Sequence, residues 1–210
     1  MSQFFQIHST HPQPRLIRRT VELIDTGGLV AYPTDSGYAL GCHIGDKAAL
    51  DRIRRIRQVD KHHNFTLVCR DLSEIANYAK VSNTNYRILK ANTPGPYTFI
   101  LQATREVPRR LQHARRKTIG IRVPDHLIAL AILEALNQPL MSCSLILPGY
   151  HQPMSDPYAI REELEREVDV VIDGGGVCPP EPTTVVDLTG EVPEVMRIGA
   201  GDTAWVGQND

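Results

Sequence analysis

The chain has only four cysteines among its 210 residues, and none of them is part of a CxxC motif. Cys42, Cys69, Cys143 and Cys178 stand far apart, and three of them lie in apolar, strand-like runs. The spacing therefore indicates neither a zinc site nor a disulfide framework, and buried free thiols fit a reducing compartment. The chain also lacks an apolar run near the ~20 residues that a membrane span needs, and lacks the apolar core of a signal peptide. These absences predict a cytoplasmic protein without a membrane partner.

Several catalytic motifs are missing as well. There is no GxSxG segment, which argues against a nucleophilic serine of the hydrolase type. The run Gly174–Gly176 lacks the Gly-Lys-Ser/Thr of a P-loop, and we interpret it as a flexible turn. His8, His11, His62 and His63 show no ligand spacing, so no bound metal is predicted.

The formal net charge is only −1, but the charges are segregated along the chain. Lysine and arginine are concentrated in residues 52–61 and 105–117, whereas the acidic residues gather between 162 and 194. A basic face attracts phosphates, so this pattern favours an anionic ligand. Two solvated surface stretches would produce the same pattern, and charge alone leaves that alternative open.

Helical and strand periodicities alternate along the chain, and 41% hydrophobic residues suffice for a full core. We expect helices over 14–25, after the N-cap Asp46, and over 72–79, 84–91, 127–136 and 158–167. We expect strands over 28–32, 38–43, 65–69, 98–102, 118–123, 140–144, 168–172 and 184–188. The alternation predicts an α/β fold in which helices flank a single open, twisted, mixed sheet, built as one domain over residues 1–210. The loops at 148–157 and 174–182 are long enough to be functional.

The arginines that end the helix after Asp46 form the strongest candidate site. Arg55 and Arg57 would point about 200° apart in a continuing helix, so they meet one ligand only if the helix ends near Arg55. The non-periodic residues that follow favour such an end, although a solvated helix face remains the alternative. Arginine is well suited to bidentate contact with phosphate or carboxylate.

Hydroxyl side chains at strand ends supply further candidates. The turn Pro33-Thr34-Asp35 offers a hydroxyl and backbone amides, although the same residues also form ordinary turns. Thr118, Arg122 and the segment Ser142-Cys143-Ser144 add hydroxyls and a cation. Small hydroxyl residues on a buried strand are often simply satisfied core residues, and that alternative stays open.

Seven segments spread from about Arg18 to Gly199 form a specific combination: GGLVAYPTDSGYALGC, RIRQVDK, PGPYTFIL, TIGIRVPDH, PLMSCS, TTVVDL and MRIG. Together they resemble the YrdC-type threonylcarbamoyl-AMP synthase family, and the chain looks most like its YciO branch. The resemblance implies the YrdC-like fold with a concave, positively charged cavity. It also implies a nucleotidyltransferase that uses ATP, with Mg²⁺, L-threonine and bicarbonate, and RNA binding (tRNA or double-stranded RNA) in parts of the family. A downstream transferase would then pass the threonylcarbamoyl group to tRNA.

The resemblance also assigns roles to residues of this chain. It implies catalytic roles for Arg55 and Arg57. It implies contacts with ATP from Arg57, Lys61, Thr118, Ser142, Ser144 and Arg197, and contacts with threonine from Thr34, Arg122 and Thr183.

Two departures from the family pattern concern the nucleotide side of the site. Arg55 stands where the family has lysine, which keeps the charge but changes reach and geometry. Ile146 stands where the family has asparagine, and an unpaired ligand group costs ~1–3 kcal/mol. The sequence therefore leaves three hypotheses: a threonylcarbamoyl-adenylate synthase, a non-catalytic RNA-binding protein of the same fold, and a sugar-phosphate enzyme. The last is based on fold analogy alone, and the missing acidic metal-site cluster argues against it.

Overall fold

The structure is a computed structural model that describes residues 1–59, 63–176 and 178–207. The strands are β1 (Gln3–Gln6), β2 (Val30–Thr34), β3 (Gly37–His43), β4 (Thr66–Val68), β5 (Tyr97–Gln102), β6 (Thr118–Arg122), β7 (Leu140–Ser144), β8 (Val170–Asp173), β9 (Thr184–Asp187) and β10 (Glu194–Arg197). The helices are α1 (Pro14–Asp25), α2 (Lys47–Arg57), α3 (Leu72–Tyr78), α4 (Asn83–Asn92), α5 (Leu127–Leu136) and α6 (Pro157–Leu164).

All of these strands belong to one sheet, in the order β1-β8-β2-β3-β7-β4-β6-β5-β9-β10. Parallel pairs (β1 with β8, β8 with β2, β4 with β6, β5 with β9) are mixed with antiparallel ones. At the centre, β7 runs antiparallel to both β3 and β4. The predicted open, mixed sheet flanked by helices is confirmed.

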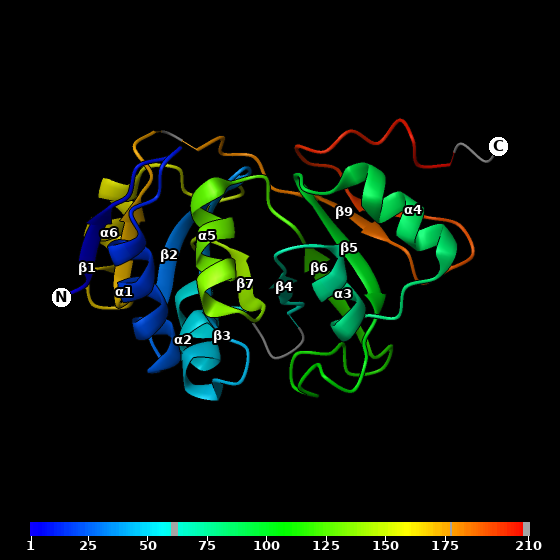
Figure 1. Ribbon diagram of the computed structural model, residues 1–210, viewed down its shortest axis with the longest axis horizontal. Coiled ribbons are helices and arrows are strands. Elements are labelled where there is room, and N and C mark those ends of the chain that lie inside the picture. The colour runs from blue at the N-terminus through cyan, green and yellow to red at the C-terminus, as the bar shows by residue number, and fades with distance from the viewer. Residues whose placement is uncertain (60–62, 177, 208–210) are drawn as a thin grey trace.

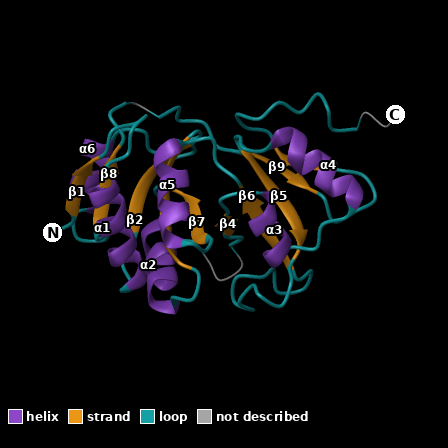
Figure 2. Ribbon diagram, in the orientation of Figure 1, coloured by secondary structure: helices purple, strands orange, loops and turns teal. Residues whose placement is uncertain are grey.

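Two hydrophobic clusters lie on opposite faces of β2, because alternate residues of a strand point to opposite sides. Val30 packs in a cluster with α1 and α5, whereas Ala31 packs in a cluster that includes Ile53 of α2 and Ile160 of α6. In Figures 1 and 2, α1, α2, α5 and α6 lie with β1, β2 and β8 in one half of the molecule. Helices α3 and α4 lie with β5 and β9 in the other half, and β4 lies between the halves.

Helix α2 corrects one expectation from the sequence. Its side-chain N-cap is Asp46, which accepts a hydrogen bond from the Ala49 amide at 2.9 Å, as predicted. The helix does not end near Arg55 but continues through Arg57, and Gln58 caps it in the left-handed conformation. A non-glycine residue rarely adopts this conformation, so the sequence carried no signal for the true end. Among the described helices, none is long and apolar enough to cross a membrane.

Both long loops reach the turn between β2 and β3. The Leu145 amide donates to the Tyr38 carbonyl at 2.8 Å, and the Tyr38 amide donates to the Met154 carbonyl at 3.0 Å. Gly37 has φ +93°, and a Cβ there would lie 2.6 Å from a Pro153 carbon and 3.3 Å from the Pro179 carbonyl oxygen. The close approach of the two loops to this turn therefore requires glycine at position 37.

Candidate functional site

A pocket of about 470 Å³ lies over the centre of the sheet, within the usual size range of small-molecule sites. Its wall is built by residues of β2, β3, β4, β5, β6, β7 and β9, with the edge strand β10 and the loop before β6 at its rim. Four arginines line it: Arg57, Arg116, Arg122 and Arg197. Among the described lining residues there is no aspartate or glutamate. The pocket is therefore electrostatically suited to an anion.

Arg57 enters the pocket from the C-terminal end of α2. The apolar face of α2, which includes Ile53 and Ile56, is buried in the core, and this burial fixes the direction of the last helical turn. The Arg57 guanidinium donates through Nη1 to the carbonyl oxygen of Ser144 on β7. Its Nε is buried and, within the described residues, has no hydrogen-bond partner. Arg57 is thus held by the protein at one nitrogen and retains donors for a ligand.

The structure does not bring Arg55 to this pocket. Arg55 is exposed on α2 and is not a lining residue, because the helix continues past it and turns its side chain away from that of Arg57. The expectation that Arg55 and Arg57 converge on one ligand is therefore wrong. Lys61, the other basic residue expected here, lies outside the described residues.

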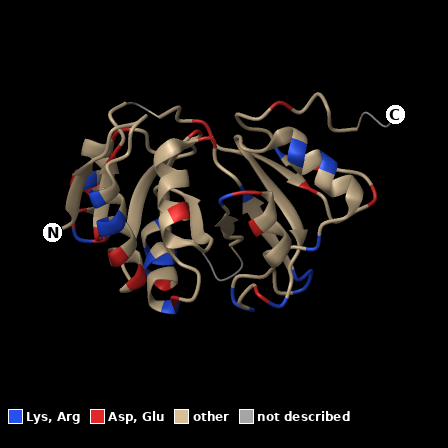
Figure 3. Ribbon diagram, in the orientation of Figure 1, with Lys and Arg blue, Asp and Glu red and all other residues tan. Residues whose placement is uncertain are grey.

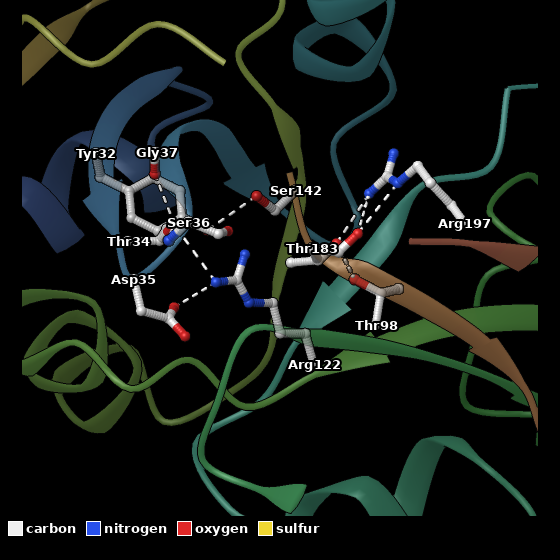
Figure 4. A network of polar contacts seen from close by, with 10 residues as sticks. All are labelled: Tyr32, Thr34, Asp35, Ser36, Gly37, Thr98, Arg122, Ser142, Thr183 and Arg197. Carbon is white, nitrogen blue, oxygen red and sulfur yellow. Dashed lines mark hydrogen bonds and ion pairs between the residues drawn. The ribbon is translucent and has the colours of Figure 1, made fainter. Parts of the chain in front are cut away.

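Arg122 at the end of β6 is the most buried arginine of the pocket, and it contacts the predicted Pro-Thr-Asp turn (Figure 4). Its Nη2 forms an ion pair with Asp35 Oδ1 and lies 3.4 Å from Thr34 Oγ1. Thr34 Oγ1 itself donates to the Gly37 carbonyl at 2.6 Å and accepts from the Ser36 amide at 3.1 Å. The turn therefore fixes a hydroxyl and a carboxylate beside one guanidinium, and the parallel pairing of β4 and β6 places that guanidinium at the centre of the sheet.

Arg197 on the edge strand β10 is directed at Thr183, just before β9 (Figure 4). Its Nη2 donates to the Thr183 carbonyl at 2.8 Å and to Thr183 Oγ1 at 3.0 Å. Thr98 Oγ1 on β5 lies 3.0 Å from Thr183 Oγ1. Partial burial lowers the pKa of Arg197, and the positive charges of Arg57 and Arg122 lower it further. The positive charges of Arg57 and Arg122 therefore act on Arg197 across the pocket.

Hydroxyl groups line the floor of the pocket. Thr118 on β6 is buried there, and Ser142 and Ser144 lie on β7. The Tyr32 hydroxyl lies 2.8 Å from Ser142 Oγ, which also lies 2.9 Å from the Leu40 carbonyl oxygen. Burial raises the pKa of Tyr32 to about 12, so this phenol stays protonated and acts as a hydrogen-bonding group.

Several residues at the site escaped the sequence analysis. Asp35 was recognised only as part of a turn, although it is the counter-ion of Arg122. His113 and Arg116 also line the pocket, from the loop that precedes β6. Their signal was hidden in a run of basic residues that reads as a solvated stretch, and Figure 3 shows Lys and Arg gathered on this loop. Ile146, the residue that departs from the family pattern, does line the pocket.

Apart from the undescribed positions, the chain contains no group of three or more His, Cys, Asp or Glu residues that could hold a metal ion. Among the described residues, Asp35 pairs with Arg122 and Asp187 pairs with Arg116.

Comparison with known proteins identifies the family. The Sua5/YciO/YrdC family profile, described as "Telomere recombination", matches residues 22–199. A Haemophilus influenzae protein named "Uncharacterized protein" is 60% identical over 205 residues, which cover 97% of this chain and 99% of that protein. A Chromobacterium violaceum protein named threonylcarbamoyl-AMP synthase is 32% identical over 178 residues, 84% of this chain and 91% of that protein. The chain therefore belongs to the Sua5/YciO/YrdC family.

Solved structures agree with this assignment. The crystal structure of Escherichia coli YciO matches with a TM-score of 0.93 and 57% identity, over 96% of this chain and 98% of that one. The crystal structure of P. abyssi Sua5 complexed with L-threonine matches with a TM-score of 0.86 and 26% identity. That match covers 94% of this chain and 58% of the Sua5 chain.

Proposed function

We propose that this protein binds ATP and L-threonine in the central pocket and makes threonylcarbamoyl adenylate. One observation carries the proposal: Arg57, Arg122 and Arg197 come from distant segments and line a single pocket whose described wall contains no acidic residue. The similarity to a threonylcarbamoyl-AMP synthase and to a Sua5 complexed with L-threonine supports the choice of ligands.

The threonine end of the pocket is formed by Thr34, Arg122 and Thr183. Arg122 supplies a cation for the threonine carboxylate, with Thr34 Oγ1 and Thr183 Oγ1 as neighbouring hydroxyls. The nucleotide end contains Arg197 together with three hydroxyl residues. These are Thr118, Ser142 and Ser144. Lys61 is proposed to join the nucleotide end, and Mg²⁺ would arrive with the phosphates of ATP.

The reaction places its main electrostatic demand on Arg57. The threonine amine first forms an N–C bond with bicarbonate and water is lost, which gives N-carbamoyl-threonine. An oxygen of the new carbamate group, not of the threonine α-carboxylate, then forms a bond to the α-phosphorus, while the Pα–O bond to the β-phosphate breaks and pyrophosphate leaves with the electron pair. Such a displacement needs positioning and charge neutralisation rather than a protein nucleophile. A preorganised guanidinium such as that of Arg57, already anchored on the Ser144 carbonyl, provides that neutralisation.

The test uses ATP labelled on the α- and γ-phosphates, with threonine and bicarbonate, and follows pyrophosphate and the acyl adenylate together. Arg57→Ala should lower the rate about 100-fold or more, the typical effect of losing one electrostatic contact to the transition state. Arg55→Ala is the matched control, because Arg55 has the same charge on the same helical turn but does not line the pocket. Ile146→Asn should raise the rate if the lost polar group limits nucleotide binding. Absence of threonine-dependent pyrophosphate release from the wild-type protein, or equal losses in the two arginine variants, would refute the proposal.

Binding of tRNA or double-stranded RNA is the second candidate function. The exposed arginines between residues 105 and 117 support it, since they add positive charge to the loop from which Arg116 lines the pocket. Such binding should weaken steeply with rising salt because counterions are released from the RNA. Binding that is absent or insensitive to salt would contradict this candidate.

A further inference from the structure

We propose that His113 and Arg116 form a second anion subsite in the pocket wall, which holds the distal phosphates of the nucleoside triphosphate and the departing pyrophosphate. This inference rests on the proposed function for the identity of its ligand. Both residues line the same pocket as Thr118, the first residue of β6, but they come from the loop that precedes this strand.

The backbone of the loop is fixed where these two residues lie. The His113 amide donates to the Thr118 carbonyl at 2.8 Å, and the Lys117 amide donates to the His113 carbonyl at 3.0 Å. The Ala103 amide donates to the Lys117 carbonyl at 2.9 Å, which joins the end of the loop to the strand that precedes it. Residues 113–117 therefore form a closed turn attached directly to the floor of the pocket.

The turn also determines which nitrogen of His113 is available. The Arg116 amide donates to His113 Nδ1 at 3.1 Å, so Nδ1 accepts and the ring proton of the neutral imidazole is on Nε2. An Nε2–H group on the wall of a pocket without acidic lining residues is a donor suited to a phosphate oxygen.

Arg116 is held at one nitrogen and open at the others. Its Nη1 lies 3.4 Å from Asp187 Oδ2, with 62% of the Arg116 side chain exposed. Asp187 Oδ1 already accepts from Thr189, from the amide at 2.9 Å and from the hydroxyl at 2.6 Å. The Asp187 side chain is only 9% exposed, so its carboxylate keeps Arg116 as a partner. A guanidinium has five N–H donors, so Arg116 can retain this ion pair and donate to a phosphate through its remaining N–H groups.

The proposed subsite lies on the exposed side of the pocket, and this distinguishes it from the site of Arg122. Arg122 is buried beside Thr34, whereas Arg116 is largely exposed. A leaving pyrophosphate must depart towards solvent, and the exposed side of the pocket is where its charge would be held last. Arg110 of the same loop donates to the Gly45 carbonyl, which ties the loop to the turn before α2. The subsite is therefore fixed to both halves of the sheet.

The experiment measures binding of AMP, ATP and inorganic tripolyphosphate by calorimetry to the wild type and three variants. Arg116→Ala removes the cation. His113→Asn removes the Nε2 donor but retains an oxygen that can accept from the Arg116 amide, so the turn is preserved. Arg115→Ala is the matched control, since Arg115 is an exposed neighbour that does not line the pocket.

We expect Arg116→Ala and His113→Asn each to weaken ATP and tripolyphosphate binding about 10-fold or more, the value of a charge-assisted hydrogen bond. AMP binding should change less than about twofold, as should every ligand with Arg115→Ala. If no nucleotide binds but tripolyphosphate binds with the same dependence on Arg116, the proposed function fails and the subsite stands. Equal weakening of AMP and ATP, equal effects of Arg115→Ala and Arg116→Ala, or no tripolyphosphate binding to the wild type would overturn the subsite.

Discussion

The ion pair between Arg122 and Asp35 should contribute strongly to stability, and Asp35→Asn tests this. The side chains are only 7% and 13% exposed, so removal of one charge leaves the other buried without its counter-charge. Breaking a buried pair in this way typically costs 3–5 kcal/mol. The asparagine oxygen can still accept from Arg122, and Thr34 Oγ1 lies nearby at 3.4 Å, so we expect a loss near the lower limit, about 3 kcal/mol. For a chain of this length, that corresponds to a fall in Tm of roughly 6–12 °C.

The assay is urea unfolding of Asp35→Asn beside Asp125→Asn. Asp125 is an exposed carboxylate three residues after Arg122, and its neutral variant should stay within about 0.5 kcal/mol of the wild type. Added L-threonine should stabilise Asp35→Asn more than it stabilises the wild type, because the ligand carboxylate replaces the missing counter-charge and binding to the native state raises its stability. A loss below about 1 kcal/mol, or equal losses in the two variants, would refute the idea that Arg122 depends on Asp35.

Two further predictions concern buried polar groups near the pocket. Tyr32→Phe removes the 2.8 Å hydrogen bond with Ser142 and should cost about 1 kcal/mol in urea unfolding, whereas Tyr150→Phe at an exposed site should cost almost nothing. Burial lowers the pKa of His126 below its ordinary value of 6.5 in the native state, so the unfolded chain binds more protons as pH falls below that value. Stability should therefore decrease with falling pH below about 6.5, and His126→Gln should make the urea midpoint less dependent on pH between about 5 and 7.

Local patterns in the sequence predicted the elements whose burial follows a simple period. The helices expected over 14–25 and 127–136 coincide with α1 and α5, because each has apolar residues at helical spacing. Pro14 and the glycines that follow α1 also mark the two ends of that helix. Strand β1 was missed: it has four residues, Gln3–Gln6, and lies at the sheet edge, where burial imposes no alternation. A periodic pattern of apolar residues therefore indicates a buried element. It carries little information about an element that is short and only partly buried.

The candidate site was predicted residue by residue, but not as a geometry. Thr34, Arg122 and Thr183 were named from motifs, and the structure places all three in one pocket, which extends across the sheet from β2 to β9. Arg55 lies outside the pocket because α2 continues to Arg57 and ends at the cap Gln58, and the sequence had no signal for this cap. The sequence alone did not distinguish His113 as a pocket residue among its basic neighbours. Only the hydrogen bonds that close the turn of residues 113–117 do so.

The polar groups that folding leaves unsatisfied indicate what the pocket is for. Within the described residues, Arg57 Nε, Arg122 Nε and Asp35 Oδ2 are all buried and lack a hydrogen-bond partner. Each such group costs about 1–3 kcal/mol, and native proteins retain few of them. Three gathered around one pocket would be a large penalty for a chain selected for stability alone, since apolar residues of similar volume would remove it. Arg57 and Arg122 both line the pocket, whereas Asp35 does not, so a ligand in the pocket meets the two guanidinium groups rather than the carboxylate. Under the proposed function, the two carboxylate groups of the N-carboxylated threonine would be the acceptors for these arginines.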